Sequence, residues 1–233
     1  MKCLFKGGRR KVAAVIAVAF VVSLSQVSPS GATSHEKPKY GGTLAVGIYS
    51  SFPGYCMADN LASSALMGAR TIYETWTEQR SDGRIVPFLL KSMAPSADRK
   101  TWKLTVRDGI KFHDGTPVDG AALLTNIQAL RGVLRLQGLT PSPGTAGGLT
   151  ANINDVKLTG PMEVTVYLYN AQSDYPESLY ASGRFFARAP SQILSGAKCS
   201  TTPIGTGPFK MASTNLSQLV VTKNTGYWRK APN

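Results

Sequence analysis

The sequence predicts an α/β fold, because segments with the two-residue period of strands alternate along the chain with segments of helical period. Residues 101–107 alternate apolar and polar side chains, residues 123–130 repeat apolar side chains at helical spacing, and residues 163–169 alternate again. With 42% hydrophobic and 17% charged residues, the 233-residue chain can also bury a substantial core.

The N-terminal residues have the pattern of a secretory signal peptide. The first eleven residues carry five basic groups and no acid, and the apolar run that follows, residues 12–22, is too short to span a bilayer. Small residues at positions 30–32 offer a cleavage site, so we expect residues 1–32 to be removed and the protein to be periplasmic or extracellular. Arg9 and Arg10 leave a twin-arginine signal as an alternative.

The charge pattern gives no support for nucleic-acid binding. Without residues 1–32 the chain retains 21 basic and 13 acidic residues, a net charge of +8. These charges are scattered and form no run of five or more and no basic helix stripe. We expect a solvated basic surface and no nucleic-acid partner.

The three cysteines are Cys3, Cys56 and Cys199. Cys3 precedes the apolar run, whereas a lipoprotein cysteine would follow it, so no lipid anchor is encoded in the usual way. In an oxidising compartment Cys56 and Cys199 are a candidate disulfide, which would stabilise the fold by at most about 4–5 kcal/mol. Residue patterns alone leave the bond open.

The first element after the signal is a predicted buried strand, Thr43–Tyr49, which is followed by a loop rich in Ser, Gly and Pro. From Leu61 onward, apolar residues recur at helical spacing and predict a helix. They are Ala65, Ala69, Ile72, Tyr73 and Trp76.

The next segments predict a half-buried strand at Thr101–Arg107 and a turn at Asp108-Gly109. Residues 110–113 continue the strand, and Asp114-Gly115 makes a second turn. We expect a helix to begin at Thr116-Pro117, with Thr as the cap and Pro in the first position. Its apolar face is Leu123, Leu124, Ile127 and Leu130.

The last predicted elements are strands. Val156–Thr159 and Glu163–Tyr169 form a hairpin around Gly160-Pro161, and Leu216–Thr222 is a further strand. Gly205 and Gly207 lie just before Pro208, and we expect them to let the backbone pass closely beside other strands where segments cross between lobes, near a cleft.

Motifs for catalysis or metal binding are sparse. His35 and His113 lack the spacing of a metal site, and Asp114 is expected to bond its own turn. Gly205-Thr206-Gly207 lacks the third glycine of a dinucleotide fingerprint. Ser195 and Lys198 match the S-x-x-K pattern of serine acyl enzymes, a spacing that also arises by chance. We predict no metal, no cofactor and no enzymatic activity.

Several segments together resemble the family 5 extracellular solute-binding proteins, the group that includes dipeptide-, oligopeptide- and nickel-binding proteins. The resemblance lies in four segments, which keep the order and spacing of the family along nearly all of the chain after residue 32. They are YGGTL (40–44), SDGRIVPFLLKSMAPSADRKTWKLTVRDGIKFHDGTPV (81–118), PIGTGPFK (203–210) and NTGYWRKAP (224–232).

This resemblance implies a periplasmic-binding-protein-like fold of type II, in which two lobes close over a ligand and the first lobe carries an inserted subdomain. Residues 33–80 would open the first lobe, 81–198 would form the subdomain, and 199–233 would return to the first lobe. The second lobe would be missing after Asn233. Cys56 and Cys199 would then share a lobe, which favours their bond.

The resemblance also implies the ligand contacts and the partners. The segment between the first strand and the helix faces the ligand in the family, so Phe52, Tyr55, Asp59 and Asn60 are the ligand-binding candidates. The alternative interpretation is an ordinary loop with packed aromatics and a helix cap. The partners would be a peptide or similar small solute and the membrane permease of an ABC importer, and we expect a monomer.

Two other functions stay open from the sequence. The same fold could serve an extracellular ligand sensor or a chaperone-like binder without transport. A secreted serine acyl enzyme built on Ser195 and Lys198 is the second alternative.

Overall fold

The computed structural model describes residues 41–49, 63–132, 150–194, 202–215 and 217–230. These residues belong to one compact unit, Gly41–Asn233. The predicted signal peptide, residues 1–32, lies outside them. Among the described residues, none of the helices has the length and apolarity to cross a membrane.

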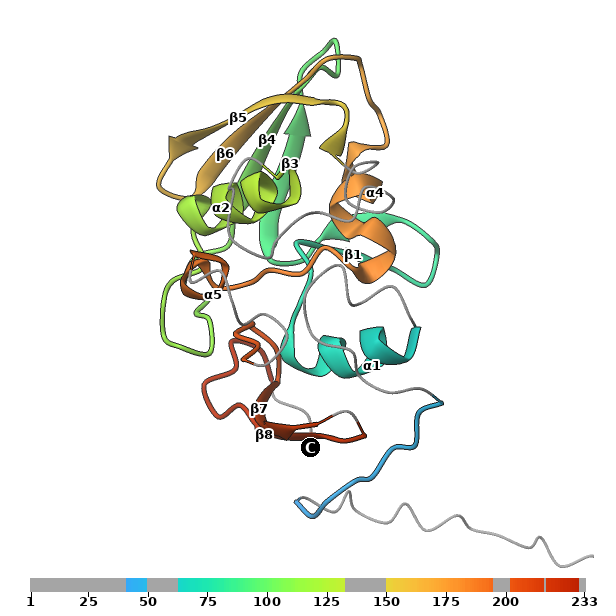
Figure 1. Ribbon diagram of the computed structural model, residues 1–233. Coiled ribbons are helices and arrows are strands. Elements are labelled where there is room, and N and C mark those ends of the chain that lie inside the picture. The colour runs from blue at the N-terminus through green and yellow to red at the C-terminus, as the bar shows by residue number, and fades with distance from the viewer. Residues whose placement is uncertain (1–40, 50–62, 133–149, 195–201, 216, 231–233) are drawn as a thin grey trace, which may run out of the picture. The chain divides into compact units, whose positions relative to one another are not determined.

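The largest sheet has four antiparallel strands in the order β3-β4-β6-β5 (Figure 1). These are β3 (Leu90–Pro95), β4 (Thr101–Val106), β5 (Ile153–Gly160) and β6 (Glu163–Leu168). The strand predicted at 101–107 and the hairpin around Gly160-Pro161 are therefore confirmed. Trp102 pairs with Val166, and Leu104 pairs with Val164, so the apolar face of β4 lies beside that of β6.

Helix α2 (Gly120–Leu130) packs on this sheet through Ala122, Leu123, Ile127 and Leu130, which share one apolar cluster with the inward residues of β4 and β6. The predicted helix start at Thr116-Pro117 is wrong. Pro117 forms a bridge with Lys111, which keeps this segment extended, and Asp119 caps the helix by accepting a hydrogen bond from the Ala122 amide at 2.8 Å.

Short elements surround the sheet. Strands β1 (Thr77–Gln79) and β2 (Ile85–Pro87) form a small hairpin. Helix α4 (Tyr175–Tyr180), the 3₁₀ turn η2 (Ala181–Gly183) and helix α5 (Pro190–Leu194) follow the sheet in the chain. None of these was predicted, because each is too short to show a clear period.

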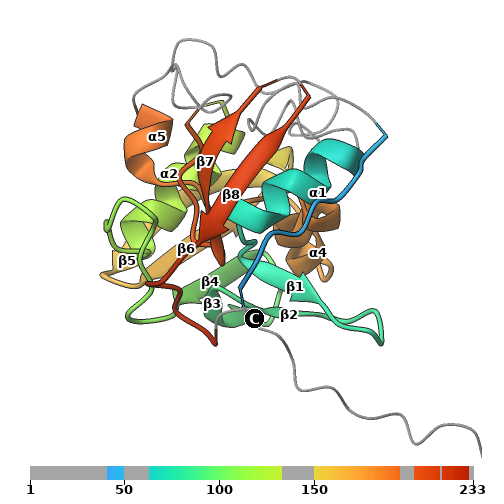
Figure 2. The same ribbon diagram turned by 90° about the horizontal axis from the view of Figure 1, so that it is seen from below.

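A second layer is built on helix α1 (Ser63–Ile72), which packs against the hairpin of β7 (Phe209–Thr214) and β8 (Leu219–Lys223) (Figure 2). Ala69, Ile72, Tyr73 and Phe186 are buried there, with Met211 and Val221 packed against them. The helix predicted from Leu61 and the strand predicted at 216–222 are thus present with shifted bounds, whereas β7 was not predicted.

The predicted buried strand Thr43–Tyr49 is wrong. This segment is extended but pairs with no described strand, and Leu44 and Tyr49 are 87% and 80% exposed. An apolar segment becomes a buried strand only where neighbouring strands supply hydrogen-bond partners and cover. The described part of the chain supplies neither.

Candidate functional site

The residues singled out in the sequence fall mostly outside the described part of the chain. This applies to the four ligand-contact candidates, to both cysteines of the candidate disulfide, and to the serine acyl motif. They are Phe52, Tyr55, Asp59, Asn60, Cys56, Cys199, Ser195 and Lys198. The structure does describe the elements that continue from these residues. The end of α1 and the segments 204–208 and 227–229 meet at one place, which we call the crossing.

The crossing lies where α1 ends. The carbonyl oxygen of Ile72 accepts a hydrogen bond from the Gly207 amide at 2.8 Å. A Cβ atom on Gly207 would lie 2.5 Å from that oxygen, so only glycine permits this approach. The predicted close passage of the backbone at Gly205 and Gly207 is confirmed, but the predicted neighbour is wrong, because the glycines lie against the end of helix α1 and not against strands.

Glu74 is the centre of the crossing. Its side chain is buried, with the residue 8% exposed, and its carboxylate accepts three hydrogen bonds. Thr206 Oγ1 and Trp228 Nε1 donate to Oε2, each at 2.8 Å, and Tyr227 Oη donates to Oε1 at 2.5 Å. We call Glu74, Thr206, Tyr227 and Trp228 the Glu74 cluster. It joins three segments that lie far apart in the sequence.

Electrostatics within the Glu74 cluster are dominated by burial. Burial raises the pKa of the Glu74 carboxyl, and the hydrogen bonds from Tyr227, Trp228 and Thr206 together with the charge of Arg229 only partly oppose it. Burial and the neighbouring carboxylate also raise the pKa of the Tyr227 hydroxyl. Both effects favour a neutral, hydrogen-bonded pair over two charges.

Aromatic packing also fixes Trp228, the indole of the Glu74 cluster. The ring centroids of Phe88 and Trp228 lie 5.7 Å apart in an edge-to-face arrangement, and the Arg229 guanidinium lies 5.0 Å from the Phe88 centroid. Trp228 is thereby fixed at both its N–H and its ring. The segment 227–229 is consequently anchored to Phe88, which follows β2, and to Glu74, which lies just after α1.

His113 is attached to the same crossing. Its Nε2 donates to the Gly207 carbonyl oxygen at 3.0 Å, its amide donates to the Gly205 oxygen at 2.8 Å, and its own carbonyl oxygen accepts from Lys210 Nζ. Burial lowers the pKa of the His113 imidazole, which is therefore neutral at pH 7. A neutral donor to a carbonyl has a structural role here.

Asp114 bonds its own turn, as predicted. Its carboxylate accepts from the amide and the hydroxyl of Thr116, at 3.0 and 2.6 Å, and from Ser191 Oγ at 2.5 Å. These three bonds fix the turn against α5. In the described residues, no group of three His, Cys, Asp or Glu side chains could hold a metal ion.

The Glu74 cluster was missed in the sequence, although Thr206, Tyr227 and Trp228 lie within quoted family segments. A usable signal was present in the Tyr73–Trp76 stretch, where a glutamate lies inside an apolar run. A buried carboxylate in such a place needs donors. The hydroxyl of Thr206 and the Trp228 N–H are donors that the sequence could have nominated.

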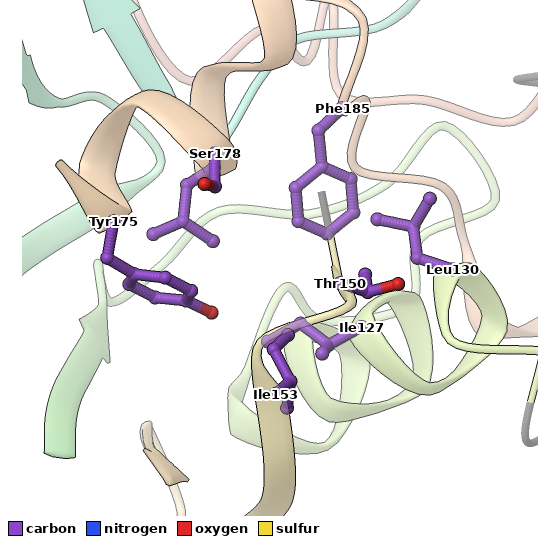
Figure 3. Close-up of a pocket in the computed structure, with 8 residues that line it drawn as sticks. Ile127, Leu130, Thr150, Ile153, Tyr175, Ser178 and Phe185 are labelled. Carbon is purple, nitrogen blue, oxygen red and sulfur yellow. The ribbon is translucent and has the colours of Figure 1, made fainter. Parts of the chain in front are cut away.

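A separate small pocket lies between α2, the start of β5 and α4 (Figure 3). Its lining is mostly apolar, with Ile127, Leu130, Ile153 and Phe185, and the Tyr175 hydroxyl points into it. The pocket has room for about one water molecule. It is too small for a peptide or a metal chelate, so it is not the site of a nutrient-sized solute.

The described residues form an α/β fold built around a four-stranded antiparallel sheet. A family model, "Bacterial extracellular solute-binding proteins, family 5 Middle", matches residues 84–233. The chain belongs to this family of bacterial extracellular solute-binding proteins. The resemblance seen in the sequence is thereby confirmed.

Individual relatives of this chain are also periplasmic binding proteins. The nickel-binding periplasmic protein of Escherichia coli K12 is 32% identical over 167 residues, covering 69% of this chain and 30% of that protein. The periplasmic murein peptide-binding protein MppA of the same organism is 30% identical over 180 residues, covering 70% and 32%. The chain thus spans about a third of the length of these curated relatives.

Solved structures give the same fold. NikA from Brucella suis, in complex with Fe(III)-EDTA, is 27% identical with a TM-score of 0.64, covering 78% of this chain and 36% of that one. DppA from Helicobacter pylori, in complex with the peptide STSA, has a TM-score of 0.67 at 16% identity over 78% and 39% of the two chains. The periplasmic-binding-protein fold predicted from the sequence is confirmed for the part that the chain covers.

Proposed function

We propose that this protein is the extracytoplasmic solute-binding component of an ABC importer, which binds a peptide or similar small solute and delivers it to the membrane permease. The match of residues 84–233 to the family model carries this proposal. Relatives that are named as peptide, glutathione or nickel binders support a small solute as the cargo. Export by the N-terminal signal is part of the proposal.

The proposed mechanism is closure of two lobes around the solute. A ligand stabilises the closed state only through contacts that the open state lacks. The Glu74 cluster would act in this mechanism as a fixed point, because it locks the end of α1 to segments 204–208 and 227–229. The segment that precedes α1 would then present Phe52, Tyr55, Asp59 and Asn60 from a rigid base.

The domain limits and the disulfide belong to the same proposal. Residues 33–80 and 199–233 would form the first lobe, with 81–198 as the inserted subdomain. A Cys56–Cys199 bond would tie the ligand-facing segment to the returning chain. Mass spectrometry of the non-reduced, trypsin-digested protein would detect a peptide pair joined through these cysteines, and two free thiols would contradict the bond.

Absence of enzymatic activity is also proposed, since the family consists of binding proteins. A fluorescent penicillin would test the serine acyl alternative. Labelling that disappears in Ser195→Ala would overturn the binding-protein assignment.

The direct test is a thermal-shift screen of the product of the complete reading frame against peptides and metal chelates. We expect a saturable rise in melting temperature with at least one class. Tyr55→Ala and Asn60→Ala should weaken that rise, whereas Lys91→Ala, an exposed change on β3, should leave it intact. A folded product that responds to no solute would contradict the proposed function.

A further inference from the structure

Arg188 is a buried cation without a described counter-charge. The residue is 4% exposed, between the 3₁₀ turn η2 and helix α5. Its Nε atom is buried and has no hydrogen-bond partner. The ion pairs of the described residues are Arg84–Asp82, Lys103–Glu163 and Lys157–Asp155, and all three lie at the surface.

The backbone of Arg188 is held firmly in place. Its amide donates to Asn126 Oδ1 at 3.0 Å, and its carbonyl oxygen accepts from Asn126 Nδ2 at 2.8 Å. Asn126 lies on α2 and is fully buried. This pair of bonds fixes the Cα position and therefore the direction in which the side chain leaves the backbone.

The neighbours of Arg188 in the segment 186–189 belong to two different apolar clusters. Ala187 and Ala189 belong to the core cluster of the large sheet, whereas Phe186 belongs to the α1 cluster and stacks on Tyr73 at 5.3 Å. Among the described titratable groups, the Tyr73 hydroxyl is the one whose ionised form would raise the pKa of Arg188.

A buried guanidinium without a counter-charge would be stabilised by a bound anion. Burial lowers the pKa of the Arg188 side chain, but arginine stays protonated at pH 7. None of the described ion pairs includes Arg188, so no described carboxylate balances the charge. A buried charge that has neither a counter-ion nor hydrogen bonds is strongly unfavourable, whereas a guanidinium fork with an oxyanion makes two parallel hydrogen bonds.

We propose that Arg188 is an anion-binding residue, which takes a carboxylate or another small oxyanion at its buried guanidinium. The anion would be nearly enclosed, so its two bonds to the guanidinium would form in a low dielectric. The site is independent of the import function, because an anion could be held there whether or not a solute is delivered to a permease.

The test compares the melting temperature of the chain in sodium acetate and in sodium sulfate with that in sodium chloride at the same ionic strength. Wild type should show an oxyanion-dependent rise that follows ligand linkage. Arg188→Met keeps an unbranched, apolar side chain without the charged guanidinium, and this variant should melt no lower than wild type without oxyanion and should lose the rise. Arg188→Lys should retain part of the rise.

The two salts identify the anion. A rise in acetate alone indicates a carboxylate site, and a rise in both salts indicates a general oxyanion site. Arg80→Met, which removes an exposed arginine, is the matched control and should respond as wild type does. The proposal is overturned if Arg188→Met keeps the full rise, if chloride gives the same rise, or if Arg188→Met is destabilised with no oxyanion dependence in wild type.

Discussion

Removal of the Glu74 carboxylate should be one of the more damaging single changes in the described fold. Glu74→Ala leaves three donors, on Thr206, Tyr227 and Trp228, without their acceptor in a buried place. A buried donor left without its acceptor costs about 1–3 kcal/mol, and three donors are affected here. Glu74→Gln preserves the volume and one acceptor oxygen, so the loss should be only about 1 kcal/mol at neutral pH.

The pH dependence distinguishes this account from simple packing. The native pKa of Glu74 is raised above its ordinary value of 4.5, so the native state binds this proton more tightly than the unfolded chain does. Its contribution to stability is therefore complete below about pH 4.5 and is lost as pH rises through the native pKa. Between these values, wild type should lose up to about 1.4 kcal/mol per pH unit relative to Glu74→Gln.

Urea unfolding of wild type, Glu74→Ala and Glu74→Gln, at a series of pH values from about 4 to 8, measures both effects. Equal losses in the two variants would show that the hydrogen bonds contribute little. A difference between wild type and Glu74→Gln that is flat, or that grows in favour of wild type with rising pH, would refute the reasoning from burial.

Two further predictions concern the same crossing. His113 has a native pKa below its ordinary value of 6.5, so its contribution to stability is present above about pH 6.5 and is lost as pH falls through the native pKa. The free energy of unfolding of His113→Gln should therefore fall less than that of wild type between about pH 7 and 5, as measured by urea unfolding. An equal fall in the two proteins would contradict burial of the neutral ring. Gly207→Ala would place a Cβ 2.5 Å from the Ile72 oxygen and should cost at least about 1–3 kcal/mol. Gly226→Ala, whose Cβ would meet only Asn224 Oδ1 at 3.6 Å, should change the melting temperature little, and equal shifts in the two variants would contradict the close passage.

The sequence predicted the elements that have a clear period and a local turn signal. The strand at 101–107 and the hairpin around Gly160-Pro161 were found because alternating residues and turn residues act within a few positions. The helix start was misplaced, since Thr116 and Pro117 satisfy the cap rules locally but their backbone is engaged by Lys111. Tertiary pairing outweighed local preference.

The site was less accessible to sequence reasoning because its residues are brought together only by folding. Glu74 meets Tyr227 and Trp228 across about 150 positions, and no local pattern encodes such a contact. Likewise, Arg188 reads as an ordinary surface arginine until its burial is known. The close passage at Gly207 was found, since a glycine without a Cβ permits a close approach of the backbone whatever its partner.

The most direct measurement is ligand binding by the product of the complete reading frame. The purified product would be screened by thermal shift against peptide and metal-chelate libraries. The account predicts a saturable, ligand-dependent rise in melting temperature. A folded product whose melting temperature responds to no solute would contradict a role as the binding component of an importer.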